Sequence, residues 1–151
     1  MTTEVVSPLA GRVLPLQEVP DPVFAGAVVG PGLAIDPPRS QADVVSPVTG
    51  RLVKLHPHAF VVVTETGSGV LVHLGIDTVH LNGEGFTLHA EEGVQVTAGQ
   101  RIVTWNPAEI EAGGRSPICP VVALDAKSEA LSDLITTGEV EAGARLFTWS
   151  V

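Results

Sequence analysis

The segment VVSPLAGRVLPL at Val5–Leu16 occurs a second time as VVSPVTGRLVKL at Val44–Leu55, with seven of the twelve positions identical. In both copies apolar pairs flank a Ser-Pro and a Gly-Arg, so each copy enters a strand, turns at the Pro and Gly, and leaves along another strand. Two such hairpin units can bury their apolar faces against each other. The repeat therefore predicts an all-β fold, an antiparallel β-sandwich or barrel with two related halves and a few short helical turns.

The remainder of the chain carries the same kind of signal. Short runs rich in Val, Ile and Thr are expected to form strands, and the segments between them to form turns. The chain contains 16 Gly and 12 Pro, which favour these turns and would interrupt most long helices. Helical turns are expected only at Pro107–Ala112, where Pro107 suits a first turn, and at Ser128–Thr136, which Ser128 could cap. The further strands expected are Phe60–Thr64, Val70–Leu74, Arg101–Trp105, Pro120–Leu124 and Arg145–Trp149, and Asp36–Ala42 is expected to be a surface loop.

Composition limits the class of protein. With 151 residues, 44% hydrophobic and 17% charged, the chain is expected to fold as one domain over residues 1–151. No apolar run approaches the roughly 20 residues of a membrane span, and the start MTTEVVSPLAG lacks a signal-peptide pattern. We therefore expect a standalone cytoplasmic protein that does not insert into a membrane.

Net charge indicates which class of macromolecule the chain could bind, and the cysteine count indicates whether it can form a disulfide. The net charge of -9, with only eight dispersed Lys and Arg, disfavours nucleic acid and favours a basic protein partner. The single Cys119 cannot form an internal disulfide and is expected to be a small core residue.

Two of the five histidines stand out by their arrangement. His58 opens the run AFVVVT, His73 lies near the end of VLVHL, and the turn-forming ETGSG joins the two runs. If the hairpin pivots about Glu65 and Thr66, residues whose numbers sum to 131 lie opposite each other, and 58 plus 73 is 131. A pivot nearer Gly67 would make the pair diagonal, still within reach of long side chains. The two imidazoles are expected to face each other.

An imidazole pair beside Asp77 supports two chemistries, metal binding or nucleophilic phosphoryl transfer. A third reading treats the two histidines as structural. His80 and His89 lie in turn-rich, polar surroundings and are expected to be surface residues.

The segment HAFVVVTETGSGVLVHLGIDTV resembles the active-site region of glucose-type enzyme IIA domains of the bacterial sugar phosphotransferase system. The segments VPDPVFAGAVVGPGLAI, the two SP-x-x-G hairpins, LNGEGF, AEEGVQVTAGQ and the later PVV follow in that family's order. The resemblance thus covers nearly the whole chain. It implies an antiparallel β-sandwich with two related halves, in agreement with the repeat.

The resemblance also implies a mechanism. The position matching the family's phosphorylated histidine is His73, and the position matching the histidine that helps to hold the phosphoryl group is His58. The implied donor is the histidine phosphocarrier protein, and the implied acceptor is a cysteine on the IIB domain of a sugar permease. For His73 to be the nucleophile, one ring nitrogen must be free, so the other is expected to donate to a backbone carbonyl.

Four further positions match the surroundings of the family's site. Asp21 and Asp77 match acidic positions that could meet a basic partner, with solvated turn carboxylates as the alternative. Val23 and Phe24 match an apolar rim that favours docking, with core packing as the alternative for Phe24. The chain departs from the family at His56, where many members carry Thr. His56 could take over the hydrogen bond of that hydroxyl and support the phosphate site, or face solvent.

Two other classes share parts of the pattern. His56-Pro-His58 and His73 to Asp77 read as the H-x-H and H-x-x-x-D ligand patterns of zinc metallopeptidases, although their order along the chain is reversed. SPVTGRLVKL and EEGVQVTAGQ resemble turns of biotinyl or lipoyl carrier domains, but Lys54 lies within an apolar strand.

No obligatory cofactor is expected. Zinc could bind His58 and His73 if a partner supplied a carboxylate, because two imidazoles leave a tetrahedral ion incomplete. Regulatory protein targets are compatible with a surface that changes charge on phosphorylation.

Overall fold

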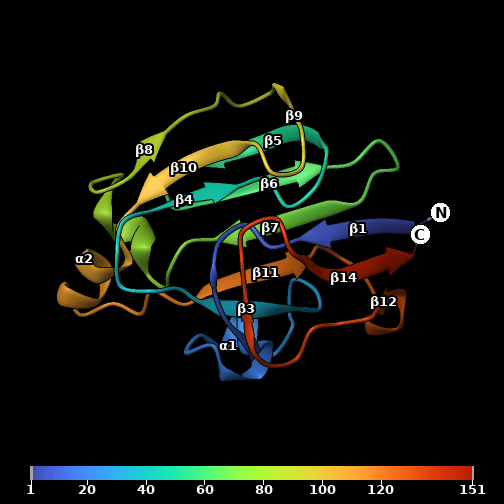
Figure 1. Cartoon of the computed structure of the whole chain (residues 1–151), viewed down its shortest axis with the longest axis horizontal. Coiled ribbons are helices and arrows are strands. Elements are labelled where there is room, and N and C mark those ends of the chain that lie inside the picture. Colours follow the sequence, from blue (N-terminus) through green and yellow to red (C-terminus); the bar gives the residue numbers. More distant parts are fainter. Residues whose placement is uncertain (1, 151) are drawn as a thin grey trace.

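The computed structural model describes residues 2–150 and consists mainly of antiparallel strands joined by tight turns (Figure 1). The all-β prediction is confirmed. Within the described residues, no helix is both long and apolar enough to cross a membrane. The strands are β1 (Thr2–Val6), β2 (Gly11–Pro15), β3 (Gly32–Asp36), β4 (Ala42–Val45), β5 (Gly50–His56), β6 (Ala59–Val63), β7 (Gly69–His73), β8 (Thr87–Leu88), β9 (Gln95–Val96), β10 (Arg101–Trp105), β11 (Cys119–Ala123), β12 (Leu131–Ser132), β13 (Glu139–Val140) and β14 (Arg145–Ser150). The helices are α1 (Pro22–Ala25) and α2 (Pro107–Ala112), with 3₁₀ turns η1 (Leu16–Glu18), η2 (Thr78–Leu81) and η3 (Ser128–Ala130).

The strands form one large sheet and two small ones. The large sheet has the order β13-β2-β3-β11-β7-β6-β5-β9, and the small sheets have the orders β1-β14-β12 and β4-β10-β8. In Figure 1, β7, β11 and β3 cross the middle of the view, with α1 below β3 and the β1–β14 pair at the right. The order of the large sheet reads symmetrically outward from the β11–β7 pair, since β3 and β6, then β2 and β5, then β13 and β9 occupy matching places.

The duplicated sequence accounts for this symmetry. Each copy supplies the end of a small-sheet strand and a whole large-sheet strand, and the two copies bind each other reciprocally. The Val6 N–H donates to the Pro47 carbonyl at 3.0 Å, and the Val45 N–H donates to the Pro8 carbonyl at 2.7 Å. In each copy the buried Ser hydroxyl donates to the carbonyl two residues on, at 2.6 Å in the first and 2.7 Å in the second. The two Ser-Pro turns therefore face each other across an approximate two-fold axis.

The symmetry extends to a second repeat that sequence reading missed. TAGQRIVTW at 97–105 and EAGARLFTW at 141–149 share five of nine residues. They form β10, which pairs with β4, and β14, which pairs with β1. The Ser46 and Ser7 N–H groups donate to the Gln100 and Ala144 carbonyls at 2.8 and 2.6 Å, respectively. Each Ser-Pro turn is therefore hydrogen-bonded to one copy of the second repeat.

Strands β2, β3 and β11 bury residues on both faces. Because successive side chains point to opposite faces, Leu33 and Ile35 enter the main core while Ala34 enters a smaller apolar cluster on the other face. The smaller cluster consists of Leu14, Leu16, Val19, Phe24, Ala34, Ile76 and Val122. Phe24 belongs to α1, so this short helix is attached to the outer face of the sheet by its aromatic side chain. Cys119 is fully buried in the main core, as expected, and burial raises the pKa of its thiol to about 12.

The helix predictions were half right. Pro107–Ala112 is α2, and the Asn106 side chain caps it by accepting the Ala108 N–H at 3.0 Å. The helical turn predicted at Ser128–Thr136 forms only over Ser128–Ala130, as η3, and the Ser128 side chain does not cap it. The following residues pair instead as β12 with β14, so a sheet edge takes the backbone groups that a helix would have used.

Gly50, in the Val44–Leu55 copy of the first repeat, is required because another strand's backbone passes very close to it. A Cβ built on Gly50 would lie 2.2 Å from the Val63 carbonyl oxygen, whereas one on Gly69 would meet nothing nearer than 3.5 Å. We expect Gly50→Ala to lower the free energy of unfolding by at least ~2 kcal/mol, because backbone must move, and the matched Gly69→Ala to change it by less than ~1 kcal/mol. Urea unfolding of both variants measures this, and equal stabilities would contradict the packing described here.

Candidate active site

The two adjacent hairpins β5–β6 and β6–β7 bring the histidines together. In β6–β7, Ala59 pairs with His73 and Val62 with Val70, so opposed residue numbers sum to 132. The predicted register, with His58 directly opposite His73, was wrong by one residue. His58 instead lies in the turn between β5 and β6, where strand alternation does not fix the direction of its side chain. Its carbonyl accepts the Leu74 N–H at 2.7 Å, which holds the turn against the end of β7.

Three imidazoles and one phenyl ring form a connected cluster. The His58 and His73 ring centroids lie 5.3 Å apart, with an angle of 72° between the ring planes. His56, at the end of β5, stacks on His58 at 5.7 Å and 26°. Phe24 contacts the His73 ring from α1 at a centroid distance of 5.2 Å. The expected facing of His58 and His73 is therefore present despite the register error, and His56 adjoins the pair.

The His73 ring has a defined tautomer. Its Nδ1 lies 2.6 Å from the carbonyl oxygen of Gly75. A carbonyl can only accept, so Nδ1 carries the proton and Nε2 has a free lone pair. Burial lowers the pKa of His73, while the hydrogen bond to Gly75 and the carboxylates of Asp21 and Asp77 act in the opposite direction. The result is a neutral imidazole at neutral pH.

His58 is also neutral at neutral pH. Its pKa falls to about 4, chiefly through burial and further through the nearby His73 and His56 rings. A neutral imidazole has one N–H donor, so His58 can donate one hydrogen bond to a group held between the rings without placing a second positive charge beside His73.

The electrostatic coupling within the cluster can be measured. We expect the His58 ring to titrate at a pH of about 4 in the intact protein and at a higher pH in His56→Ala, because that change removes one of the groups that lower its pKa. NMR titration of the ring protons measures both values. His80→Ala is the matched control, since His80 is exposed in η2. A His58 midpoint near its ordinary value of about 6.5 in the intact protein would contradict the described burial.

The lowered pKa of His58 also determines how the stability of the folded protein changes with pH. In the unfolded chain His58 takes up its proton at about pH 6.5, whereas in the folded chain it does so at about 4. Between these values the unfolded state binds more protons, so the stability present above pH 6.5 declines as the pH falls toward 4. The lowered pKa of His73 acts in the same direction.

The expected rim residues lie on the two segments that flank the rings. Asp21 caps α1 by accepting the Val23 N–H at 2.9 Å, and the Val23 side chain is 44% exposed. Phe24 is buried in the smaller apolar cluster and also contacts the His73 ring. It therefore packs in a core, and it also lies beside the histidines. Asp77 is exposed, with a left-handed backbone (φ 60°), directly before η2.

Sequence reading missed two exposed apolar residues on these segments. Val28 is 72% exposed and Val79 is 52% exposed, and the Val28 N–H donates to the Val23 carbonyl at 3.0 Å. The only available signal was an apolar residue within a short, turn-rich segment, which does not distinguish exposed from buried. His89 lies away from the cluster and pairs with Thr104 at 2.6 Å, and His80 is exposed; neither joins the three imidazoles.

The sequence and the fold of this chain both have counterparts among known proteins. A family model described as the phosphoenolpyruvate-dependent sugar phosphotransferase system, EIIA 1, matches residues 3–129. The chain belongs to this EIIA family. The EIIA component of this system is a phosphotransferase.

Relatives of the EIIA family cover nearly the whole chain. The glucose-specific EIIA component of Oceanobacillus iheyensis is 40% identical over 141 residues, which are 92% of this chain and 84% of that protein. The glucose-specific EIICBA component of Streptococcus pneumoniae is 42% identical over 144 residues, 94% of this chain and 20% of that protein. The solved structure of glucose permease IIA from Mycoplasma capricolum matches with a TM-score of 0.89 and 32% identity, covering 98% of this chain and 96% of that one.

EIIA membership leaves the two alternative classes without support. In the part of the chain that the structure describes, no three His, Cys, Asp or Glu side chains are grouped so as to hold a metal ion, although a metallopeptidase site would need such a group. Lys54 lies inside β5 opposite Val61, whereas a biotinyl or lipoyl carrier presents its lysine at a hairpin tip.

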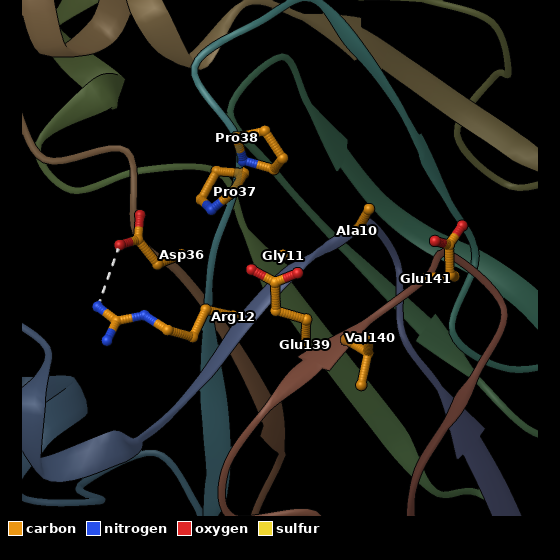
Figure 2. A pocket seen from close by; sticks show the side chains of 9 residues that line it. All are labelled: Ala10, Gly11, Arg12, Asp36, Pro37, Pro38, Glu139, Val140 and Glu141. Atoms are coloured by element: carbon orange, nitrogen blue, oxygen red, sulfur yellow. Dashed lines mark ion pairs between the residues drawn. The ribbon is translucent and has the colours of Figure 1, made fainter.

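A cavity elsewhere on this EIIA chain does not contain the histidine site. Figure 2 shows it between β2, the end of β3 and β13, with a volume of about 440 Å³. Arg12 pairs with Asp36 at its edge at 3.6 Å, and Glu139 and Glu141 also line it. None of the three clustered histidines is among its lining residues. The three clustered histidines lie instead at the ends of the β5–β6 and β6–β7 hairpins, with Phe24 of α1 against His73.

Proposed function

We propose that the chain is a phosphoryl carrier of the sugar phosphotransferase system that receives phosphate on His73 Nε2. The observation that carries this proposal is the 2.6 Å contact between His73 Nδ1 and the Gly75 carbonyl, which leaves Nε2 free beside His58. The donor is the histidine phosphocarrier protein, and the acceptor is a cysteine on the IIB domain of a sugar permease.

Each transfer is a direct displacement. The lone pair of His73 Nε2 forms a bond to the phosphorus as the bond from phosphorus to the donor's ring nitrogen breaks, and the electron pair returns to that ring. In the second step the cysteine thiolate forms the bond to phosphorus and the lone pair returns to His73 Nε2. The proton on Nδ1 stays throughout, so the phosphorylated ring is cationic, and the Gly75 carbonyl, Asp21 and Asp77 stabilise it.

The neighbouring residues have separate proposed roles. His58 donates a hydrogen bond to a phosphoryl oxygen, and His56 supports it by stacking on its ring. Val23 and Phe24, together with Asp21 and Asp77, form the surface on which a partner with a basic rim docks. The chain carries 17 acidic against 8 basic residues, which suits such partners.

The IIB partner is supported by the relatives. Single polypeptides named EIICBA and EIIBCA contain a region similar to this chain, which occupies only 18–20% of their length. We propose that this chain meets its IIB partner in the cytoplasm as one domain and needs no obligatory cofactor. Zinc could be shared between His58, His73 and a partner's carboxylate, since two imidazoles suit that ion and leave ligand positions open.

A two-step transfer assay tests the proposal. The chain is incubated with phosphoenolpyruvate, enzyme I and the histidine phosphocarrier, then analysed by intact mass at alkaline pH, where phosphohistidine persists. We expect the added mass of one phosphoryl group, which is lost again when the isolated phosphoprotein is mixed with a glucose-type IIB domain. An unchanged mass with a donor that phosphorylates a known EIIA component would overturn the proposal, and metal analysis and a peptidase assay would follow.

A further inference from the structure

The loop that follows β7 supplies the carbonyl on which the His73 tautomer depends. The Gly75 carbonyl accepts from His73 Nδ1, and one residue earlier the Leu74 N–H donates to the His58 carbonyl at 2.7 Å. Both histidines are therefore hydrogen-bonded to two consecutive residues, Leu74 and Gly75. Whatever fixes these two residues also fixes the acceptor of the His73 ring relative to the backbone of His58.

Thr78 contacts both Leu74 and Gly75. Its side chain is 1% exposed, and its hydroxyl donates to the Leu74 carbonyl at 2.7 Å. Its methyl group lies against Gly75, because a Cβ built on that glycine would be only 2.8 Å from Thr78 Cγ2. The φ of Gly75 is 77°, a conformation that favours glycine, so Thr78 occupies the space that this backbone leaves.

The rest of the loop is held from the segment before β11. The Ile76 N–H donates to the Ser116 carbonyl at 2.9 Å, and Arg115 Nε donates to the Asp77 carbonyl at 3.2 Å. These bonds fix the outer part of the loop. Of Thr78 and Arg115, whose side chains both hydrogen-bond to backbone carbonyls of this loop, only Thr78 bonds to Leu74. Leu74 and Gly75 are the residues that hydrogen-bond to His58 and His73.

We propose that Thr78 is a positioning residue for phosphoryl transfer. Its hydroxyl and methyl hold the Leu74 and Gly75 peptides so that the Gly75 carbonyl accepts the Nδ1 proton of His73 and Nε2 keeps its lone pair toward the incoming phosphorus. Its hydroxyl bonds to a backbone carbonyl rather than to either ring. This role rests on the proposed function of His73, but the tautomer that it controls exists before any phosphate arrives.

The test compares Thr78→Val, which keeps the shape and removes the hydroxyl, with Thr78→Ser, which keeps the hydroxyl and removes the methyl. The readout is the His73 tautomer in the unphosphorylated protein, measured from ring ¹⁵N shifts above neutral pH, together with the rate of phosphoryl uptake. We expect Thr78→Val to populate the Nε2–H form and to lower the uptake rate on the order of 10-fold. Thr78→Ser should restore most of the Nδ1–H form and of the rate. Thr66→Val, in the exposed turn at the other end of the same hairpin, is the control for the loss of a hydroxyl.

The outcomes separate this proposal from the one on which it rests. A wild-type tautomer in folded Thr78→Val overturns the positioning role, whether or not uptake falls. If Thr78→Val does not fold, a His73 tautomer in Thr78→Ser unlike that of the intact protein overturns the role, since the hydroxyl is still present. Failure of the intact protein to accept phosphate would refute the proposed function while leaving the tautomer measurement intact.

Discussion

His73→Ala is expected to accept no phosphoryl group from the histidine phosphocarrier, because it removes the only clustered imidazole whose Nδ1 is held by a backbone carbonyl. Phosphoryl transfer depends on a nucleophile placed in line with the leaving group, and neither of the two remaining imidazoles is fixed in that way. Intact-mass analysis at alkaline pH after incubation with the donor measures the result. The loss should be complete within detection.

Two controls accompany this variant. His80→Ala removes an exposed histidine seven residues further along the same segment and should accept phosphate as the intact protein does. His73→Gln keeps a polar side chain of similar length at the end of β7 and should be as inactive as His73→Ala while remaining folded. Undiminished, alkali-stable phosphate on folded His73→Ala would show that another residue is the carrier.

His58→Gln is expected to accept phosphate but to deliver it to the IIB domain about 100-fold more slowly, the loss typical of a removed transition-state hydrogen bond. The amide keeps an N–H donor, so a phosphoryl group can still be held on His73. It lacks the rigid ring that lies 5.3 Å from His73 and stacks on His56, so the donor is no longer aimed as the bond to Nε2 breaks.

Single-turnover transfer from the isolated phosphoprotein measures this rate apart from uptake. His56→Gln is the matched comparison, because it alters the outer ring of the stack and leaves His58 in place; a smaller loss is expected. Delivery at the rate of the intact protein by His58→Gln would remove His58 from the mechanism.

Much of the fold could be predicted because the sequence repeats itself. The Val5–Leu16 and Val44–Leu55 copies predict two halves, and their reciprocal hydrogen bonds join those halves in the structure. The second repeat, in β10 and β14, was overlooked because its identities are spread over TAGQRIVTW and EAGARLFTW. The error at Ser128–Thr136 has a physical cause, since the available edge of β14 pairs with Leu131 and Ser132 and overrides a local helical pattern.

The site could be predicted in its residues but less well in its geometry. The one-residue register error arose because His58 belongs to the β5–β6 turn, so the symmetry of the β6–β7 hairpin alone does not place it. The backbone acceptor for His73 was expected, but its identity as Gly75 depends on a left-handed residue in a loop. The role of Thr78 was not foreseen, because it follows from its contacts with Leu74 and Gly75 rather than from the type of residue.

The most direct test of the account is to locate the phosphoryl group on the ring of His73. The ¹⁵N-labelled chain is phosphorylated by the donor and examined by NMR at alkaline pH, where coupling between phosphorus and nitrogen identifies the bonded atom. The account predicts phosphorus on Nε2 of His73, the ring nitrogen that the Gly75 contact leaves free. Phosphorus on Nδ1 of that ring, or on His58 or His56, would contradict it.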